Sequence, residues 1–357
     1  MATRSKRSGA TIAGIVFLSI LLAIVVVALA VVAYVYIRLG SIKKLPVDPE
    51  HFAEESFDGS NESVQETFET DSLPDDTSVL IIDDSEISWD VSWEENENSE
   101  ETENSQEETA SGDWLFSDSN ITNIMLIGVD GHGYSGRSDT MILITLDRGT
   151  GEVHMTSFMR DLYVQIPGYS NNRLNAAYAF GGIRLMDRTF ERNFGIHIDG
   201  HVLVNFDSFP QVINAMGGVD ITLTQAEAEI VGVGGAGTYR LNGSQAMKYA
   251  RIRKIDSDFS RTNRQRTLLN SLFKRMKKLG FTEMVNMANK VLNLVYTDMN
   301  ANRILGLAGD FMSVGEIQQL RVPGNGEYYD AYIRKMMVLV PYLGTIHERL
   351  GRELYHK

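Results

Sequence analysis

Hydrophobic and polar positions divide this chain of 357 residues into three parts. The first is an apolar run, residues 11–37, that carries no charged side chain. As a helix rising about 1.5 Å per residue, it is long enough to cross a hydrocarbon core of roughly 30 Å. The apolar region of a signal peptide is usually about 7–15 residues long, so the pattern favours an uncleaved transmembrane helix. The small-residue sequence Ala28-Leu29-Ala30 leaves cleavage open.

Charges beside this run do not settle its orientation. Three basic residues precede it and three follow it, so the positive-inside rule gives a near tie. An N-terminal anchor followed by a large domain normally exports that domain. We therefore expect residues 1–10 to form a cytoplasmic tail and the rest of the protein to be extracytoplasmic, held at the cell membrane as a single-pass protein with the lipid bilayer as a partner.

The second part is strongly acidic. Residues 45–113 hold 24 Asp and Glu and no Lys or Arg, whereas residues 114–357 hold 27 basic and 23 acidic side chains. Low hydrophobicity combined with charge of one sign predicts disorder. We therefore expect residues 38–113 to be an acidic, disordered linker that acts as a spacer, with a candidate strand only at 79–82.

The third part, residues 114–357, alternates short apolar runs with segments of helical period. It therefore predicts a layered α/β domain. The predicted strands are 123–129, 141–146, 153–158, 162–166, 201–206, 219–223 and 317–322. The predicted helices are 174–194 with a break at Gly181-Gly182, 209–216, 244–251, 261–279, 282–296 and 302–312.

Five arginines and a lysine crowd residues 250–266, at the start of the helix predicted from Arg261. At about 100° per residue, Arg261 shares the apolar face of that helix and Arg264 lies at its edge. Cations are disfavoured in a first helical turn, so these two arginines need an anion, and a helix N-terminus with arginine forks suits a phosphate. The alternative is that Asp256 and Asp258 neutralise them.

A second charged cluster follows the first predicted strand. Asp130 ends that strand, and the next loop brings Arg137 and Asp139 to the start of the following strand. If the strands are neighbours, both carboxylates meet at one end of the sheet, which suits Mg²⁺. The alternative, that they are turn and capping aspartates, is the commoner role on spacing alone. Arg160-Asp161 adds another pair after the third strand, and His132 is better explained as a loop histidine than as a metal ligand.

The chain has no cysteine, so it has neither disulfides nor thiolate metal sites. It also lacks HExxH, G-x-S-x-G and a Walker lysine. Zinc-peptidase, serine-hydrolase and P-loop chemistry therefore have no support in the sequence.

Several ordered blocks make residues 123–278 resemble the LytR-CpsA-Psr (LCP) family of cell-wall glycopolymer ligases. The blocks are GVD (128–130), RSDTM (137–141), MRDLYVQIPG (159–168), RLNAAYAFGG (173–182), GGVD (217–220), LNGSQAMKYARIR (241–253) and DFSRTNRQR (258–266). Two positions depart from the usual pattern: Met159 stands where proline is usual, and Arg173 where lysine is frequent. Neither departure removes a charged site residue.

The resemblance implies an LCP-type three-layer α-β-α fold, with a central mixed sheet flanked by helices on both faces, for a catalytic domain at 114–357. It implies a phosphotransferase that moves glycopolymers, such as teichoic acid or capsular polysaccharide, from a polyprenyl-diphosphate carrier to peptidoglycan. A phosphodiester forms and polyprenyl phosphate is released. The implied partners are therefore the carrier-linked glycopolymer and peptidoglycan, with no nucleic acid expected.

The same resemblance assigns roles to individual residues. Asp130 and Asp139 match carboxylates that hold Mg²⁺ (or Mn²⁺). The catalytic residues implied are Arg160, Asp161, Arg251 and Asp139, and either aspartate could be the general base. The diphosphate-binding residues implied are Arg137, Arg160, Arg251, Arg253, Arg261, Arg264 and Gln265.

Three other functions fit parts of the pattern. A polyprenyl-diphosphate hydrolase would use the same arginines with water as acceptor. A nucleic-acid binder would carry the arginines on an exposed face inside the cell, against the inward helical phase. A non-catalytic cell-wall binding protein would not need the paired aspartates. The polyprenyl tail would need an apolar tunnel, for which Phe206, Phe209, Ile213 and Met216 are candidates, although a core role is the commoner one for each.

Overall fold

The computed structural model describes residues 43–46, 79–91, 114–130, 133–252, 258–276, 278, 283, 286–287, 290–300, 302–304, 306–307, 310 and 317–357. No helix among them is both long enough and apolar enough to cross a membrane. The transmembrane helix predicted at 11–37 and most of the predicted linker lie outside the described residues.

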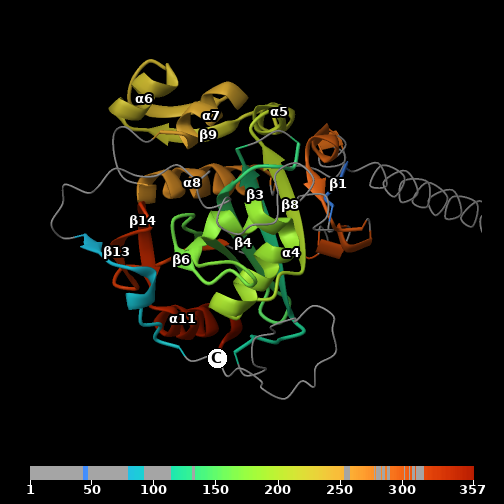
Figure 1. Ribbon diagram of the computed structural model, residues 1–357. Coiled ribbons are helices and arrows are strands. Elements are labelled where there is room, and N and C mark those ends of the chain that lie inside the picture. Colours follow the sequence, from blue (N-terminus) through green and yellow to red (C-terminus); the bar gives the residue numbers. More distant parts are fainter. Residues whose placement is uncertain are drawn as a thin grey trace, which may run out of the picture.

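A central mixed sheet organises the domain (Figure 1). Its strand order is β1-β11-β8-β3-β4-β5-β12. The strands are β1 (Lys43–Lys44), β11 (Tyr296–Thr297), β8 (Gly200–Asn205), β3 (Ile121–Val129), β4 (Ser138–Asp147), β5 (Val153–Phe158) and β12 (Ile317–Val322). β4 runs antiparallel to both β3 and β5, while β8 is parallel to β3 and β12 is parallel to β5. The carboxyl ends of four strands and the amino end of β4 therefore meet at one end of the sheet.

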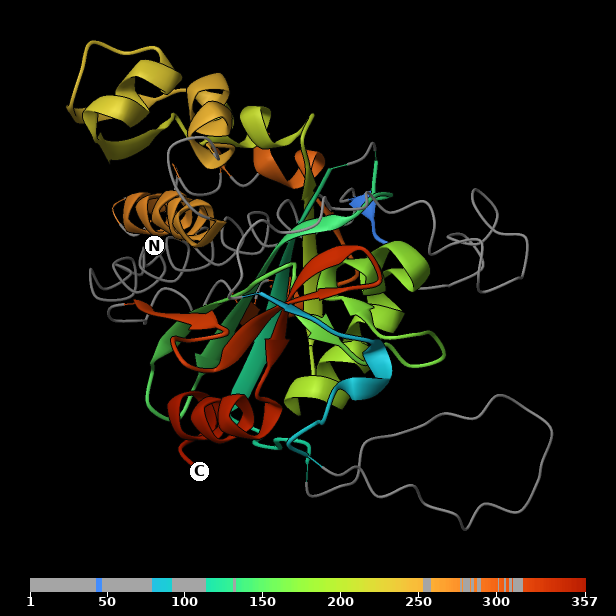
Figure 2. The ribbon, with the colours of Figure 1, turned by 60° about the vertical axis from the view of Figure 1, so that its left-hand side comes forward.

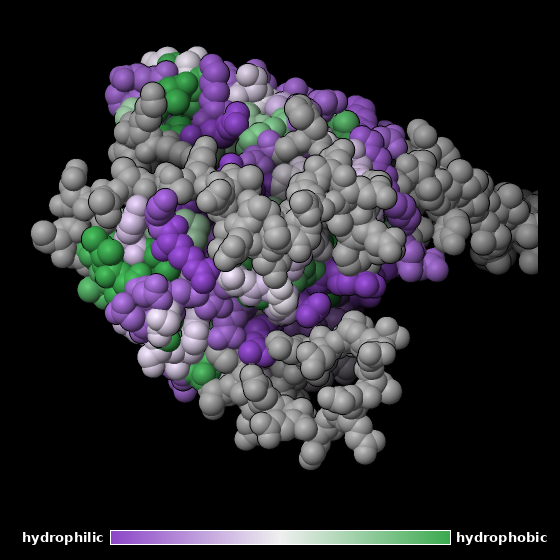
Figure 3. All heavy atoms as spheres, viewed as in Figure 1, coloured by the Kyte–Doolittle hydropathy of each residue, from purple (hydrophilic) through white to green (hydrophobic). Residues whose placement is uncertain are grey.

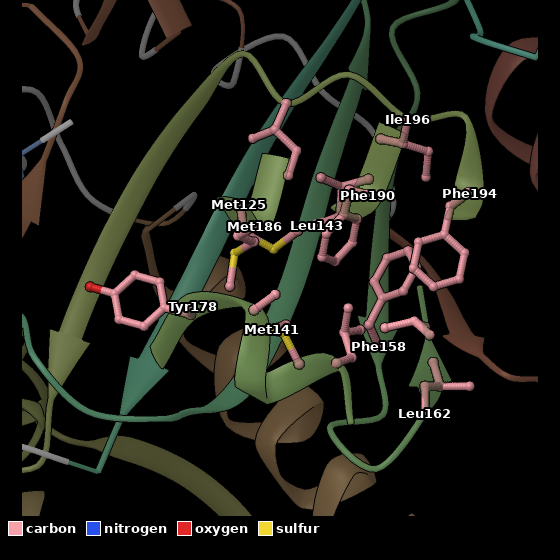
Figure 4. Close-up of a cluster of buried hydrophobic side chains, with 14 of the residues drawn as sticks. Met125, Met141, Leu143, Phe158, Leu162, Tyr178, Met186, Phe190, Phe194 and Ile196 are labelled. Carbon is pink, nitrogen blue, oxygen red and sulfur yellow. The ribbon is translucent and has the colours of Figure 1, made fainter. Parts of the chain in front are cut away.

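One face of this sheet packs on helix α4 (Leu174–Phe194), and helix α11 (Leu343–Tyr355) contributes to the same core. Figure 4 shows Met125, Met141 and Phe158 from the sheet against Met186 and Phe190 from α4. Alternate residues of each strand supply this face, as the period of two requires. Gly181 and Gly182 leave helical geometry inside α4, which confirms the break predicted at that pair.

A second core lies beyond the end of the sheet at which these strand ends meet (Figure 2). Its elements are α5 (Phe209–Ala215), β9 (Val219–Leu223), α6 (Gln225–Val231), β10 (Gly237–Leu241), α7 (Gly243–Ala250) and α8 (Asp258–Met276). Ile213 and Met216 are buried in this core. They therefore take the core role and not the role of tunnel residues.

Part of the predicted linker is ordered on the domain, which corrects the prediction of disorder at those residues. β2 (Leu80–Ile81) pairs with β13 (Tyr328–Ile333), which pairs with β14 (Met336–Pro341). The 3-10 helix η1 (Asp84–Glu86) follows β2, and buried Ile87 joins the small core beneath this sheet. Leu80 and Ile81 are exposed. Figure 3 shows hydrophobic side chains gathered on the side of the molecule where β2 and β13 lie. Apolar residues scattered through the acidic sequence therefore anchor it.

The short elements complete the chain: the hairpin strands β6 (Tyr163–Val164) and β7 (Asn172–Arg173), and the 3-10 helix η2 (Leu292–Leu294). Strands 153–158, 219–223 and 317–322 and helix 174–194 are confirmed to the residue. α6, β10, β13, β14 and α11 were not predicted. α8 begins at Asp258 and not at Arg261, so Arg264 lies in its second turn. The helix-dipole argument for an anion at Arg264 is therefore wrong.

Candidate active site

Strand register brings the charged residues of three segments to one end of the sheet. Val129 pairs with Ser138 and Gly128 pairs with Thr140, so Asp139 lies in β4 at the register shift between them, and Asp130 lies one residue past the end of β3. Met141 pairs with Phe158, which places Arg160 two residues beyond the same end. The predicted meeting of the two carboxylates depends on β3 and β4 being neighbours, and they are.

The carboxylate of Asp130 is bound to Arg137 by three hydrogen bonds. Its Oδ1 accepts a hydrogen bond from the backbone N–H of Arg137 at 2.8 Å, and its Oδ2 accepts from Nε and Nη2 at 3.3 and 3.2 Å. The loop between them is held from outside, because Asn205 Nδ2 donates to the Gly133 carbonyl at 2.8 Å and the Tyr178 hydroxyl donates to the Tyr134 carbonyl. The loop therefore presents a carboxylate and a guanidinium in one fixed arrangement.

Arg160 joins two carboxylates. Its Nη1 donates to Asp139 Oδ1 at 2.8 Å, and its Nε donates to Asp161 Oδ2 at 3.3 Å. Arg173 Nε lies 3.6 Å from Asp161 Oδ1, and Arg173 also donates to the Met337 carbonyl. All four side chains are partly buried, which strengthens their electrostatic interactions relative to water. The group is an alternating series of positive and negative charges that fixes each member in place.

Arg251 reaches the same end of the sheet from a different element. It is the C-terminal capping residue of α7, where the helix dipole favours a cation. Its guanidinium lies 4.2 Å from the ring centroid of Phe206, a cation–π contact. Phe206 directly follows Asn205, which pairs with Val129, so Arg251 lies near the strand end that carries Asp130.

Arg261 and Arg264 point inward, as the helical phase predicts, and are only 4% and 5% exposed. The anion that meets Arg264 is a protein carboxylate: Arg264 Nε donates to Glu227 Oε1 at 2.8 Å and Nη1 donates to the Ile252 carbonyl at 3.2 Å. Burial by itself raises the pKa of Glu227, but the hydrogen bonds from Arg264 and Thr224 outweigh it and lower that pKa. Arg264 therefore forms an ion pair in the second core. Its hydrogen bond to the Ile252 carbonyl also places it near Arg251, the preceding residue in the chain.

The match to a family model extends over residues 87–341, most of the chain and all of the site described above. The protein belongs to the LytR_cpsA_psr family. It is 33% identical over 231 residues to the polyisoprenyl-teichoic acid–peptidoglycan teichoic acid transferase TagU of Oceanobacillus iheyensis, a match covering 60% of this chain and 70% of that protein.

Solved structures of named proteins have a similar fold. The crystal structure of B. subtilis TagV is 30% identical, covers 67% of this chain and 99% of its own, and superposes with a TM-score of 0.56. The structure of TagT bound to LIIa-WTA is 26% identical, covers 66% and 92%, and has a TM-score of 0.57. Because the family match begins at residue 87, the family fold includes the ordered end of the acidic segment.

Not every residue singled out in the sequence can be placed. Arg253, Asp256 and His132 lie outside the described residues, as does the side chain of Asp258. Gln265 is half-buried on α8, beside Arg264. Asp130, Arg137, Asp139, Arg160, Asp161 and Arg251 are gathered at the sheet end.

Sequence reasoning missed two residues of this region. Glu227 was readable only as the third residue of a capping box with Thr224, which the structure shows, and nothing in the sequence pairs it with Arg264. Arg173 was noted as a departure from the family pattern and not as a site residue. Its contact with Asp161 follows from the β6–β7 hairpin, in which Tyr163 pairs with Arg173.

Proposed function

We propose that this protein transfers a glycopolymer from a polyprenyl-diphosphate carrier to peptidoglycan, as the name of its relative TagU describes for that protein. The observation that carries the proposal is the gathering of Asp130, Asp139, Arg160 and Arg251 from four segments at one end of the sheet. Phosphoryl transfer needs positioning and charge stabilisation more than covalent participation by the protein. This set of side chains provides both.

In this transfer the glycopolymer keeps one phosphate of the diphosphate, and the other stays on the lipid. A hydroxyl oxygen of peptidoglycan attacks the phosphorus that bears the glycopolymer, and the P–O bond to the lipid-side phosphate breaks. The products are a phosphodiester and polyprenyl phosphate. Arg137, Arg160 and Arg251 bind the diphosphate and stabilise the charge that develops on the leaving phosphate. The hydroxyl proton passes to Asp139 or Asp161, which flank Arg160 on opposite sides.

Asp130 and Asp139 are the residues that would hold a Mg²⁺ (or Mn²⁺) ion. The described residues contain no group of three or more His, Cys, Asp or Glu side chains arranged for a metal. Two carboxylates on paired strands still fit Mg²⁺, because that ion retains several waters and is commonly bound by one or two carboxylates together with substrate phosphates. Such an ion would neutralise diphosphate charge.

The second face of the sheet is suited to the polyprenyl tail. Leu126, Ile142 and Val202 are apolar neighbours by strand register on the face opposite α4, and Leu126 and Val202 are only half-buried. This apolar row leads toward Gly128 and Thr140, directly before the site residues. The tail would then lie on that face beneath the outer helices of an LCP-type three-layer arrangement.

Membrane attachment follows from the apolar run at 11–37. Only five residues separate that run from Lys43, a span of at most about 20 Å between Ile37 and Lys43. β1 is an edge strand of the catalytic sheet, held by Leu45 N donating to the Thr297 carbonyl at 3.0 Å and by Lys44 Nζ donating to the Met299 carbonyl at 3.0 Å. The domain is therefore kept close to the extracytoplasmic surface of the bilayer, where a lipid-linked donor resides.

The test uses the full-length protein in lipid nanodiscs with a polyprenyl-diphosphate oligosaccharide, peptidoglycan fragments and Mg²⁺. Glycan covalently joined to peptidoglycan through a phosphodiester supports the transferase. Free glycan phosphate would indicate the hydrolase instead, and tight donor binding without turnover would indicate a binding protein.

A further inference from the structure

A hairpin connects the charged site to a polar hollow on the surface. β6 and β7 form its two strands, and its base is the contact of Arg173 with Asp161. Its loop, residues 165–171, lines an open hollow of about 430 Å³ together with Arg192 of α4. Three or four extended residues separate Asp161 from the hollow, a distance of about 10–14 Å. An extended polymer bound at the site has the length to reach it.

The hollow is built rigidly. Pro167 and Gly168 occupy the central positions of a turn in which Tyr169 N donates to the Ile166 carbonyl at 2.9 Å, and Gly168 has φ of 80°, as a type II turn requires. Asn193, fully buried, both accepts from Gln165 N at 3.0 Å and donates to the Gln165 carbonyl at 2.7 Å. The loop is thus fixed to α4 before any ligand arrives.

The side chains in the hollow suit a sugar. Tyr169 is 37% exposed and stacks on Phe180 with ring centroids 5.1 Å apart, so Phe180 supports one face of a tyrosine ring at the surface. Gln165 accepts from Arg192 Nε at 3.1 Å, which places an amide and a guanidinium side by side. An aromatic surface packs against the C–H face of a sugar ring, while amide and guanidinium groups bind its hydroxyls and acids.

A stripe of positive charge leads to this hollow along α4. Arg184, Arg188 and Arg192 are spaced four residues apart on the side opposite the core residues, each about 6 Å from the next along the helix axis. The neighbouring acids face histidines: Asp187 lies 2.8 Å from His201 Nε2 and Glu191 lies 2.7 Å from His197 Nδ1. Among the described residues, neither Arg184 nor Arg188 makes an ion pair with those acids, so the stripe keeps its positive character.

We propose that the arginine stripe of α4 and the hollow at 165–171 form a binding surface for an anionic glycan. This inference rests on the proposed function, because the surface would bind a part of the polymer away from the reacting phosphate. Two sources share this chemistry: the glycopolymer of the donor, and the carboxylate-bearing glycan strand of peptidoglycan. α4 begins directly after Arg173, and its Arg192 lines the hollow whose loop starts four residues after Asp161. It would hold a polymer in register with the reacting groups.

The experiment measures binding without turnover, using the full-length protein in nanodiscs of zwitterionic lipid. The probes are fluorescent poly(glycerol phosphate) oligomers, peptide-free glycan strands of peptidoglycan and a neutral chitin oligosaccharide. The variants are Arg184→Gln with Arg188→Gln, and Tyr169→Ala. Arg352→Gln with Lys335→Gln is the matched control, since both residues are exposed and lie on other elements.

We expect the double arginine variant to weaken binding of an anionic probe about tenfold, and Tyr169→Ala to weaken it about fivefold, because each exposed contact contributes only modestly to binding. The control pair should bind like the wild type. Loss confined to poly(glycerol phosphate) assigns the surface to the donor, and loss confined to the peptidoglycan strand assigns it to the acceptor. Wild-type affinity of both test variants for both anionic probes, or no binding of either by the wild type, overturns the proposal.

The binding experiment and the transfer experiment can fail independently of each other. A wild-type protein that transfers glycan while the test variants bind normally contradicts only the binding surface. A wild-type protein that transfers nothing, yet loses glycan binding in the test variants, contradicts only the transferase.

Discussion

Arg160 Nη1 lies 2.8 Å from Asp139 Oδ1, and this single contact joins the loop after β5 to the start of β4. The same guanidinium holds Asp161 through Nε, so one arginine positions both carboxylates that are candidates for the general base. A guanidinium has five N–H donors in a planar fork, so it can hold these carboxylates and still meet a phosphate oxygen.

Replacing Arg160 by Ala should lower kcat for glycan transfer by at least about 100-fold, the scale found when one preorganised donor to developing charge is removed. Steady-state transfer assays on the full-length protein test this. Arg352→Ala is the control, because Arg352 is an exposed arginine of α11 that pairs only loosely with Glu353, at 3.7 Å. Turnover within twofold of wild type would remove Arg160 from the site.

Substitutions at Arg251 and Phe206 should reduce the rate of glycan transfer by different factors. Arg251→Ala removes a charge from the proposed diphosphate site and should reduce transfer at least about tenfold. Phe206→Leu keeps the charge and removes only the cation–π contact, which contributes about 0.5–1 kcal/mol, so we expect a loss of about two- to fivefold. Equal losses in the two variants would mean that Arg251 acts through packing and not through its charge.

Asp130 and Asp139 should determine the metal requirement. Asp130→Asn should raise the Mg²⁺ concentration for half-maximal transfer by at least about tenfold, because it removes one proposed ligand. Asp139→Ala should reduce transfer at least about tenfold at any Mg²⁺ concentration, because Asp139 also positions Arg160. Transfer that is unaffected by EDTA would contradict both assignments to the metal.

Glu227 should be important for folding. Glu227→Gln removes the carboxylate that pairs with the buried Arg264 guanidinium among the described residues, and breaking such a pair costs roughly 3–5 kcal/mol. For a domain of this size, the Tm should fall by about 6–20 °C. Thermal unfolding measures this, with Glu229→Gln as control, since Glu229 is exposed on the same helix and accepts only from Gln225. A Tm like that of the control would show the pair to be dispensable.

His201 should make stability depend on pH. It is 1% exposed, and Nδ1 and Nε2 lie 2.8 Å from Asp298 and Asp187. Burial by itself lowers the pKa of His201, but hydrogen bonds to the two carboxylates outweigh burial and raise it from 6.5 to about 9. The folded pKa exceeds the unfolded value, so this stabilisation is full below about pH 6.5 and is lost as the pH rises towards 9.

The Tm of the wild type should therefore fall between pH 6.5 and pH 9. His201→Gln should lower the Tm at pH 6 and flatten this pH dependence. His197→Gln, at an exposed histidine that pairs with Glu191, is the control and should leave the slope unchanged. A wild-type Tm that is constant across this range would show that His201 stays neutral.

The sequence by itself determined the elements whose periodicity is strong. Strand 153–158 and helix 174–194 were predicted to the residue, since a short segment that alternates apolar and polar residues and a long amphipathic helix specify local structure directly. It also determined which face of α8 is buried. Through the family motifs it named Asp130, Asp139 and Arg160 as site residues, and the structure gathers them at one end of the sheet. The composition of the acidic segment led to a wrong prediction of disorder at residues 79–91. Ile87 and Trp89 pack on the domain there, but they are few among many charged residues.

Only the tertiary structure decided which charge meets which. Arg264 pairs with Glu227, 37 positions away, a partner that no pattern in the sequence indicated. Arg173 reaches Asp161 because a hairpin folds back, and Arg251 packs on Phe206, the residue that follows β8. Electrostatic and hydrogen-bond energies depend on distances of a few ångströms, and those distances come from the packing of elements far apart in sequence.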